Sequence, residues 1–312
     1  MRLLVVLFGV VLAADLCAGQ AAGPAPTTPI PGSDADLVQR GEKLSHDGKQ
    51  DEALALYAQA LGKDPNSYYA QLESGIALDL KGEYAKAQEH LAKAVDIATP
   101  ESKQQALRAL AFSYAFQGDA FKAADPEMEV FNERLAKGDN VGAGETCDEL
   151  ARIYLELGDP DHAYKWYKMG YDTVSRKIDL SDADKNLWLF RWESAQARVA
   201  ARLGNIEDAQ QHVRAAKPAL DKAHNPDQMR FYPYITGYVA FYGGDYKTAI
   251  SELQNADQHD PFILVLLAQA YEKSGDQAQS MNYYRRVLEI NVHNPTNAFA
   301  RPLAKKKLQT GS

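Results

Sequence analysis

Cysteine is almost absent from this sequence, whose 312 residues include only Cys17 and Cys147. Cys17 lies in a leader that we expect to be removed, so the remaining chain can form no internal disulfide. A domain without disulfides depends on a large core, and a hydrophobic content of 46% is sufficient for one. Cys147 falls at a helix-packing position, and we interpret it as a buried structural thiol.

Positive charge is scarce as well. The chain has 34 Lys and Arg against 42 Asp and Glu, a net charge of −8. Its only basic cluster is Lys305–Lys307 near the C-terminus. Because binding to nucleic-acid phosphates requires a basic surface, we expect no nucleic-acid partner. The lysine run is interpreted as a solvated helix end that complements the helix dipole.

The apolar run at the N-terminus, residues 3–14, is too short to cross about 30 Å of hydrocarbon as a helix. It follows Arg2 and precedes small residues, so residues 1–20 predict a cleaved signal peptide whose cleavage site stays open. We therefore expect a periplasmic or secreted protein with no membrane span in the mature chain. Lipid anchoring through Cys17 is the less favoured alternative. Residues 21–33 are rich in alanine and proline and predict a flexible linker.

Motifs for catalysis and metal binding are missing. The seven histidines are scattered, and there is no nucleophile elbow, phosphate loop or zinc-protease signature. One weak candidate for calcium ligands comprises Asp182, Asp184, Asn186 and Glu193. Leu187 stands where a calcium loop requires glycine, and Ser181 with Asp184 predicts a capped helix start instead. We therefore expect no catalytic residues, no metal site and no cofactor.

Glycine recurs where one apolar, helix-patterned run ends and the next begins. These glycines are Gly48, Gly82, Gly118, Gly158, Gly204, Gly244 and Gly275. Alanine stands five residues after each of the first six, and Gly or Ala stands seven residues before every one. The small residues allow two helices to approach closely, and each glycine predicts a left-handed turn at a helix C-terminus. The pattern indicates an internal repeat of antiparallel helix pairs.

The residues of the first unit carry a family resemblance. They are Gly41, Leu44, Gly48, Ala53, Tyr57, Ala60 and Pro65. This pattern resembles the tetratricopeptide repeat, and it extends over residues 34–292. The resemblance implies an all-α fold, a right-handed superhelical solenoid of about seven antiparallel helix pairs. Residues 293–312 predict a C-terminal capping helix and tail that cover the last repeat.

Several units depart from the repeat. In the third, Pro126 is expected to break or kink the second helix, and Glu127 stands where an apolar residue is expected, so residues 125–142 are the least certain. An insertion over residues 174–186 is expected between the fourth and fifth units. Cap residues followed by proline predict helix starts at Thr99-Pro100, Asn225-Pro226, Asp260-Pro261 and Asn294-Pro295.

The resemblance implies that peptides would bind on the inner, concave face of the superhelix, as they do in members of the tetratricopeptide-repeat family. The residues at the positions that clamp a C-terminal carboxylate in some members are Val38, Glu42, Glu73, Gln105 and Ala109, so that clamp is absent. The sixth unit instead has an aromatic face of Phe231, Tyr234, Tyr238, Phe241 and Tyr242, continued by Phe262. The favoured interpretation is that neighbouring helices cover this face, and the alternative is a groove for a partner.

Charged residues line the middle units. Acidic and basic side chains of the fourth unit are Glu145, Asp148, Arg152 and Glu156, and the fifth unit contributes Arg191, Arg198 and Arg202. We expect the two rows to neutralise each other as surface pairs of small energy. The alternative is that Arg191 and Arg198 contact a partner.

The resemblance and these faces predict a non-enzymatic scaffold that binds a protein or peptide in the cell envelope or outside the cell. The alternative is a self-associating structural or envelope-assembly factor, a homo-oligomer paired through its aromatic face. A hydrolase or metal-binding protein is a remote alternative.

Overall fold

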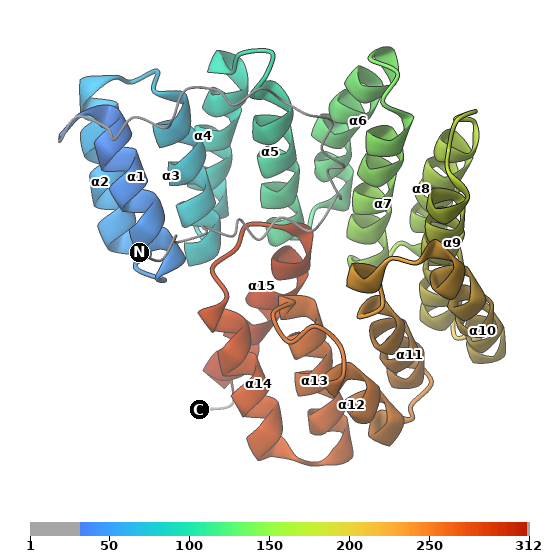
Figure 1. Ribbon diagram of the computed structural model, residues 1–312. Coiled ribbons are helices and arrows are strands. Elements are labelled where there is room, and N and C mark those ends of the chain that lie inside the picture. Colours follow the sequence, from blue (N-terminus) through green and yellow to red (C-terminus); the bar gives the residue numbers. More distant parts are fainter. Residues whose placement is uncertain (1–31, 311–312) are drawn as a thin grey trace, which may run out of the picture.

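The computed structural model describes residues 32–310. The predicted signal peptide and nearly all of the predicted linker lie outside the described residues. Within that range the chain forms α helices that pack in consecutive pairs as a solenoid (Figure 1). The first pairs are α1 (Asp34–His46) with α2 (Gln50–Lys63), α3 (Tyr68–Lys81) with α4 (Tyr84–Ile97), α5 (Lys103–Gln117) with α6 (Ala120–Ala136), and α7 (Asn140–Glu156) with α8 (Pro160–Ser175). The others are α9 (Asp182–Arg202) with α10 (Ile206–Ala223), α11 (Phe231–Tyr242) with α12 (Tyr246–Gln254), and α13 (Pro261–Ser274) with α14 (Gln277–Glu289).

Each pair turns at one of the glycines predicted from the sequence. All seven have a positive φ, from 80° at Gly48 and Gly244 to 99° at Gly158. Only glycine adopts this conformation without strain, so the prediction of left-handed turns is confirmed. Gly138, between α6 and α7, also has a positive φ of 74° and was not singled out by the repeat pattern.

The small residues of the repeat lie where paired helices touch. A Cβ atom added to Gly75 would stand 2.5 Å from Cγ of Leu91, which is a fully buried residue of α4. A side chain at this position would force α3 and α4 apart. The contact explains why this position holds glycine, and the same close approach of Tyr57 to Gly41 and of Leu253 to Gly237 explains glycine in the first and sixth units.

Two of the four helix starts predicted before a proline are confirmed, since α13 begins at Pro261 and α15 (Pro295–Thr310) at Pro295, whereas Pro226 opens only a three-residue 3-10 helix ahead of α11. The side chains of Asp119, Asp159 and Asp245 each accept a hydrogen bond from a backbone N–H in the first turn of α6, α8 and α12. Asp260 does the same before Pro261, at the start of α13. The prediction at Thr99-Pro100 was wrong, because α5 begins at Lys103 after a short turn.

The expected break at Pro126 does not occur. Helix α6 runs unbroken from Ala120 to Ala136, with Pro126 inside it. Proline removes one intrahelical hydrogen bond, but Ala123, Ala124 and Val130 on the same helix are buried against neighbouring helices. Tertiary packing therefore maintains the helix across the proline.

The expected insertion over residues 174–186 is also largely helical. α8 continues to Ser175 and α9 begins at Asp182. The extra length of this unit lies in α9, which has 21 residues. Only residues 176–181 connect the two helices.

Glu127 is a buried carboxyl group in α6. Its exposed fraction is 0%, and neither carboxyl oxygen has a hydrogen-bond partner among the described residues. Burial raises the pKa of Glu127 well above its ordinary value, and the charge of Glu149 raises it further. Burial therefore favours the neutral form of Glu127 in the folded protein.

Glu127→Gln is expected to remove a pH dependence of stability. The pKa is raised on folding, so above pH 4.5 the unfolded chain releases a proton that the folded protein retains. The contribution of Glu127 to stability then falls as pH rises, by at most about 1.4 kcal/mol per pH unit until the folded pKa is reached. Urea unfolding of both proteins between pH 5 and pH 7, in about half-unit steps, measures the difference. Parallel stability profiles for the two proteins would contradict the prediction.

The last helix, α15 (Pro295–Thr310), covers the final repeat as predicted but also contacts earlier helices. It packs on α13 and α14, and on the far side on α5 and α7 (Figure 1). Its Ala298 belongs to the core around α5 and α7, whereas Ala300 and Ala304 belong to the core of the C-terminal pairs. The superhelix thus curves until its C-terminal end meets its first half.

Polar contacts fix α15 in this position. Arg301 is 8% exposed and donates through Nε to the carbonyl oxygen of Leu80 at 2.9 Å. Its Nη1 donates to the carbonyl oxygens of Leu288 and Ile290 at 3.2 and 3.1 Å. Lys305 donates to the carbonyls of Leu80 and Lys81, so of the predicted solvated lysine run only Lys306 is exposed.

Candidate functional site

A cavity of about 240 Å³ lies on the inner face, where the middle repeats meet the start of α15. Its polar walls are formed by Arg108, Arg134, Glu145, Asp148, Glu149, Arg152, Tyr167, Arg191, Ser194, Arg198, Gln228, Tyr234 and Thr296. Its apolar walls are formed by Phe190, Phe231, Ile235 and Pro295. The arginines outnumber the carboxylates in the walls, although the whole chain has a net charge of −8. The cavity is therefore an electropositive site in an acidic protein.

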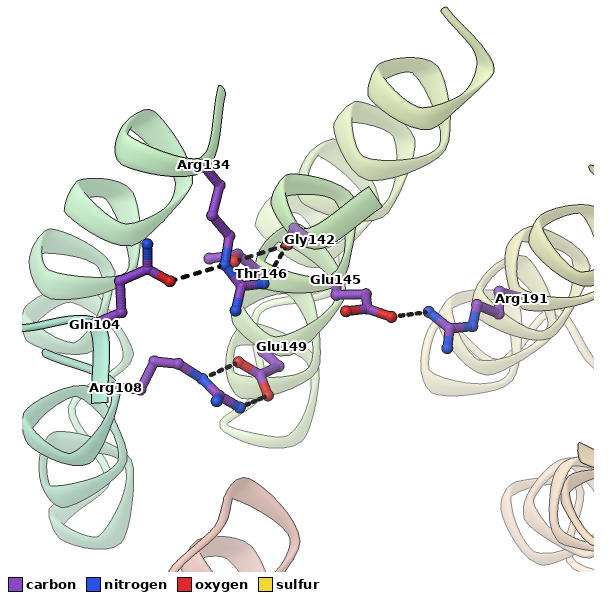
Figure 2. A network of polar contacts seen from close by, with 8 residues as sticks. All are labelled: Gln104, Arg108, Arg134, Gly142, Glu145, Thr146, Glu149 and Arg191. Atoms are coloured by element: carbon purple, nitrogen blue, oxygen red, sulfur yellow. Dashed lines mark hydrogen bonds and ion pairs between the residues drawn. The ribbon is translucent and has the colours of Figure 1, made fainter. Parts of the chain in front are cut away.

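One wall of the cavity is a network that joins α5, α6, α7 and α9 (Figure 2). Arg108 of α5 binds Glu149 of α7 with two hydrogen bonds, of 3.0 Å from Nε and 2.5 Å from Nη2. Arg134 of α6 donates through Nη1 to the carbonyl oxygen of Gly142 at 2.6 Å. Arg191 of α9 lies 3.6 Å from Glu145. The two-pronged geometry of the Arg108 pair holds its guanidinium in a fixed orientation.

A second network is buried and adjoins the cavity through Arg152. Glu156 of α7 is 2% exposed in its side chain and accepts from Nε of Arg152 at 2.9 Å and from Nη1 of Arg202 at 2.7 Å. The hydroxyl group of Tyr238 donates to the same carboxylate at 3.3 Å. The expected pairing of opposite rows is confirmed for Arg202 and Arg191, but the expectation of surface pairs was wrong. Buried pairs of this kind are costly to break.

Two carboxyl groups beside the cavity have altered acidity. Burial raises the pKa of Asp148 to about 6, with Arg191 and Arg198 acting in the opposite direction. Burial likewise raises the pKa of Glu145, again opposed by Arg191. Above pH 6 the ionised form of Asp148 predominates, and below it the cavity loses one negative charge. The site therefore becomes more positive in mild acid.

The predicted aromatic residues are placed in two groups. Tyr234, Tyr238 and Phe262 are buried in the C-terminal core, with exposed fractions of 5%, 0% and 5%. Phe241 and Tyr242 are half-buried against that core. Phe262 also contacts Phe299 of α15, with ring centroids 6.0 Å apart. Neighbouring helices and α15 therefore cover most of the face, as the favoured interpretation held.

Four of the predicted partner-binding residues line the cavity. They are Phe231, Tyr234, Arg191 and Arg198. Tyr238, Phe241, Tyr242 and Phe262 are outside its walls. Whether any of them contacts a partner stays a prediction. The sequence did not predict that Arg108, Arg134 and the start of α15 line the cavity. The repeat pattern is local and does not show which distant repeats approach one another.

The local geometry decides how the remaining candidates, the calcium-loop residues and Cys147, are to be interpreted. Ser181 accepts from the backbone N–H of Asp184 at 3.1 Å, and its hydroxyl donates to that aspartate at 2.6 Å. Asp182, Asp184 and Asn186 thus lie at the start of α9 and Glu193 in its middle, as the capped-helix interpretation predicted. Cys147 is fully buried, and burial raises its thiol pKa, which agrees with a structural role.

Residues 32–310 form neither a metal-binding cluster nor a membrane-spanning helix. They contain no group of three or more His, Cys, Asp or Glu side chains placed to hold a metal ion. None of the helices in this range combines the length and hydrophobicity needed to span a bilayer.

Sequence comparisons agree with the repeat pattern. Four tetratricopeptide-repeat models match residues 44–111, 146–172, 193–215 and 263–291. A TPR repeat-containing protein of Methanocaldococcus jannaschii is 24% identical over 246 residues, which are 76% of this chain and 39% of that protein. The chain thus spans about two fifths of the length of this relative.

Solved structures share the fold. A tetratricopeptide repeat protein from Parabacteroides merdae aligns with a TM-score of 0.50 and 12% identity, over 88% of this chain and 97% of that one. The apo form of RapI aligns with a TM-score of 0.55 and 12% identity, over 89% and 99%. Similarity at this level of identity shows the architecture alone.

Proposed function

We propose that this chain, whose repeats match tetratricopeptide-repeat models in four segments, is a non-enzymatic scaffold that binds a protein or peptide partner. Repeat solenoids of this kind present extended concave surfaces for binding. The leader-like residues 1–20 support a location in the cell envelope or outside the cell. This location is part of the proposal.

The observation that carries the proposal is the cavity on the inner face. It combines an apolar anchor position at Phe231 with fixed arginines such as Arg108 and Arg191. Binding sites between proteins are enriched in aromatic residues and arginine, and a few such residues provide most of the affinity. The side chains are held by networks before any partner arrives, which reduces the entropy lost on binding.

Phe231→Ala is expected to weaken partner binding by about tenfold or more, because Phe231 is the half-buried aromatic residue of the cavity wall. Partners captured from an envelope extract would be identified by mass spectrometry, purified, and titrated by calorimetry. Phe121→Ala is the matched control, because Phe121 is 65% exposed and lies outside the cavity. Equal affinity of the wild-type protein and Phe231→Ala would refute the proposed site. Melting temperatures of both variants exclude loss of fold as the cause.

Sedimentation of the purified chain tests the alternative of self-association. The aromatic face proposed for pairing is largely covered within the chain. We therefore expect a monomer at micromolar concentration.

A further inference from the structure

We propose that the cavity contains a binding site for a carboxylate group attached to a compact apolar body, centred on Arg198. The site extends the proposed function to a ligand chemistry. It is built by α9, α11 and the start of α15, and it differs from the clamp positions that are absent from this chain.

Arg198 is the arginine of the cavity whose guanidinium has the least complete set of hydrogen bonds and ion pairs within the protein. Its Nη2 donates to the hydroxyl oxygen of Tyr167 at 3.0 Å, and its Nε has no hydrogen-bond partner among residues 32–310. In the same range no carboxylate lies within 4.0 Å of its guanidinium, whereas Arg108 and Arg152 each have one and Arg191 has two. The positive charge of Arg152 repels Arg198, and the carboxyl group of Asp148 attracts it without forming an ion pair within 4.0 Å. An anion placed here would relieve that repulsion.

Two buried hydroxyl groups in the same walls lack partners. Ser194 lies one helical turn before Arg198 on α9, and Tyr234 lies on α11 in the same cavity wall. Each is 5% exposed, and neither hydroxyl has a hydrogen-bond partner among the described residues. Buried polar atoms of folded proteins nearly always have partners. A guanidinium and two hydroxyl groups together offer the donors that a carboxylate accepts.

Two helix N-termini add positive potential. α11 begins at Phe231 and α15 begins at Pro295, and both residues line the cavity. The N-terminus of a helix carries a partial positive charge that favours anions. Because Phe190, Ile235 and Pro295 form the apolar walls, the body attached to the carboxylate should be apolar.

The first test is calorimetry of the full chain with benzoate and with benzamide, which have the same shape but differ in charge. We expect benzoate to bind at least about tenfold more tightly, because hydrogen bonds to a charged acceptor are the stronger ones. Arg198→Met should weaken benzoate binding by about tenfold or more, and Tyr234→Phe by a smaller factor. Arg214→Met, an exposed arginine of α10, is the matched control and should bind benzoate as the wild type does.

The second test distinguishes whether the site binds a free small acid or an acidic side chain of a peptide. The tripeptide acetyl-Phe-Glu-Ala-amide is compared with its Gln counterpart. Binding of the Glu peptide supports a site for acidic peptide segments, and binding of benzoate alone supports a site for small acids. Equal binding of benzoate and benzamide, or benzoate binding unchanged in Arg198→Met, would overturn the proposal. Only the peptide experiment rests on the proposed function. If benzoate binds but no partner is captured, the carboxylate site stands and the proposed partner binding fails.

Discussion

Arg301→Ala is expected to lower the free energy of unfolding by about 3–5 kcal/mol. The substitution removes a guanidinium that donates to the carbonyl oxygens of Leu80, Leu288 and Ile290. Lys305 still donates to Leu80 and Asn297 to Ile290, so the carbonyl of Leu288 is the one that loses its side-chain donor. Each buried unsatisfied group costs about 1–3 kcal/mol, and the charge-assisted bonds of a guanidinium are lost as well. Because these carbonyls belong to the ends of α3 and α14, the contact between the two ends of the superhelix is weakened.

Urea unfolding followed by circular dichroism measures this effect. Lys306→Ala is the control on the same helix, because Lys306 is exposed and its loss should cost less than about 0.5 kcal/mol. Arg301→Lys should recover only part of the stability, since an ammonium group lacks the planar fork that reaches several carbonyls. If Arg301→Ala and Lys306→Ala unfold at the same urea concentration, the anchoring role of Arg301 is wrong.

Glu156→Gln is expected to cost about 3–5 kcal/mol, although it preserves the shape of the side chain. The change removes the negative charge between Arg152 and Arg202, which bind the two carboxylate oxygens at 2.9 and 2.7 Å. Removing one partner of a buried ion pair leaves uncompensated charge in a region that water scarcely reaches. Their guanidinium groups also stack on the rings of Phe262 and Tyr242, so they cannot simply turn toward solvent.

Glu207→Gln on the exposed side of α10 is the matched control and should be close to neutral. A double variant, Glu156→Gln with Arg202→Met, should be more stable than the sum of its single changes predicts, because it removes one of the unpaired charges. A loss below about 0.5 kcal/mol in Glu156→Gln would show that the network contributes little.

The repeat itself was predictable because its signals are local. A glycine such as Gly158 is required where the chain turns, and a small residue such as Gly75 is required where two helices touch, so each unit shows the same pattern in a short stretch. The break predicted at Pro126 was wrong for the same reason. Local propensity favours a break there, but packing of the neighbouring alanines preserves α6.

The site was only partly predictable because its members come from distant segments. Arg198 and Phe231 were visible as unusual inner-face residues. Arg301 resembles an ordinary surface cation in the sequence, yet its partner Leu80 is 221 residues away. Glu156 has an arginine four residues before it, the spacing of an exposed helical pair, and nothing local shows that α11 will cover it.

The contact of α15 with α3 and α5 has a consequence for how this chain folds. A simple solenoid contacts only its neighbours, so its units can form in order as they emerge. Here the bond from Arg301 to Leu80 can form only after α15 has been synthesised, and it closes a loop of more than two hundred residues at an entropic cost that grows only slowly with loop length. Folding of the first repeats is then completed from the C-terminal end, which makes the transition more cooperative than stacking of independent repeats.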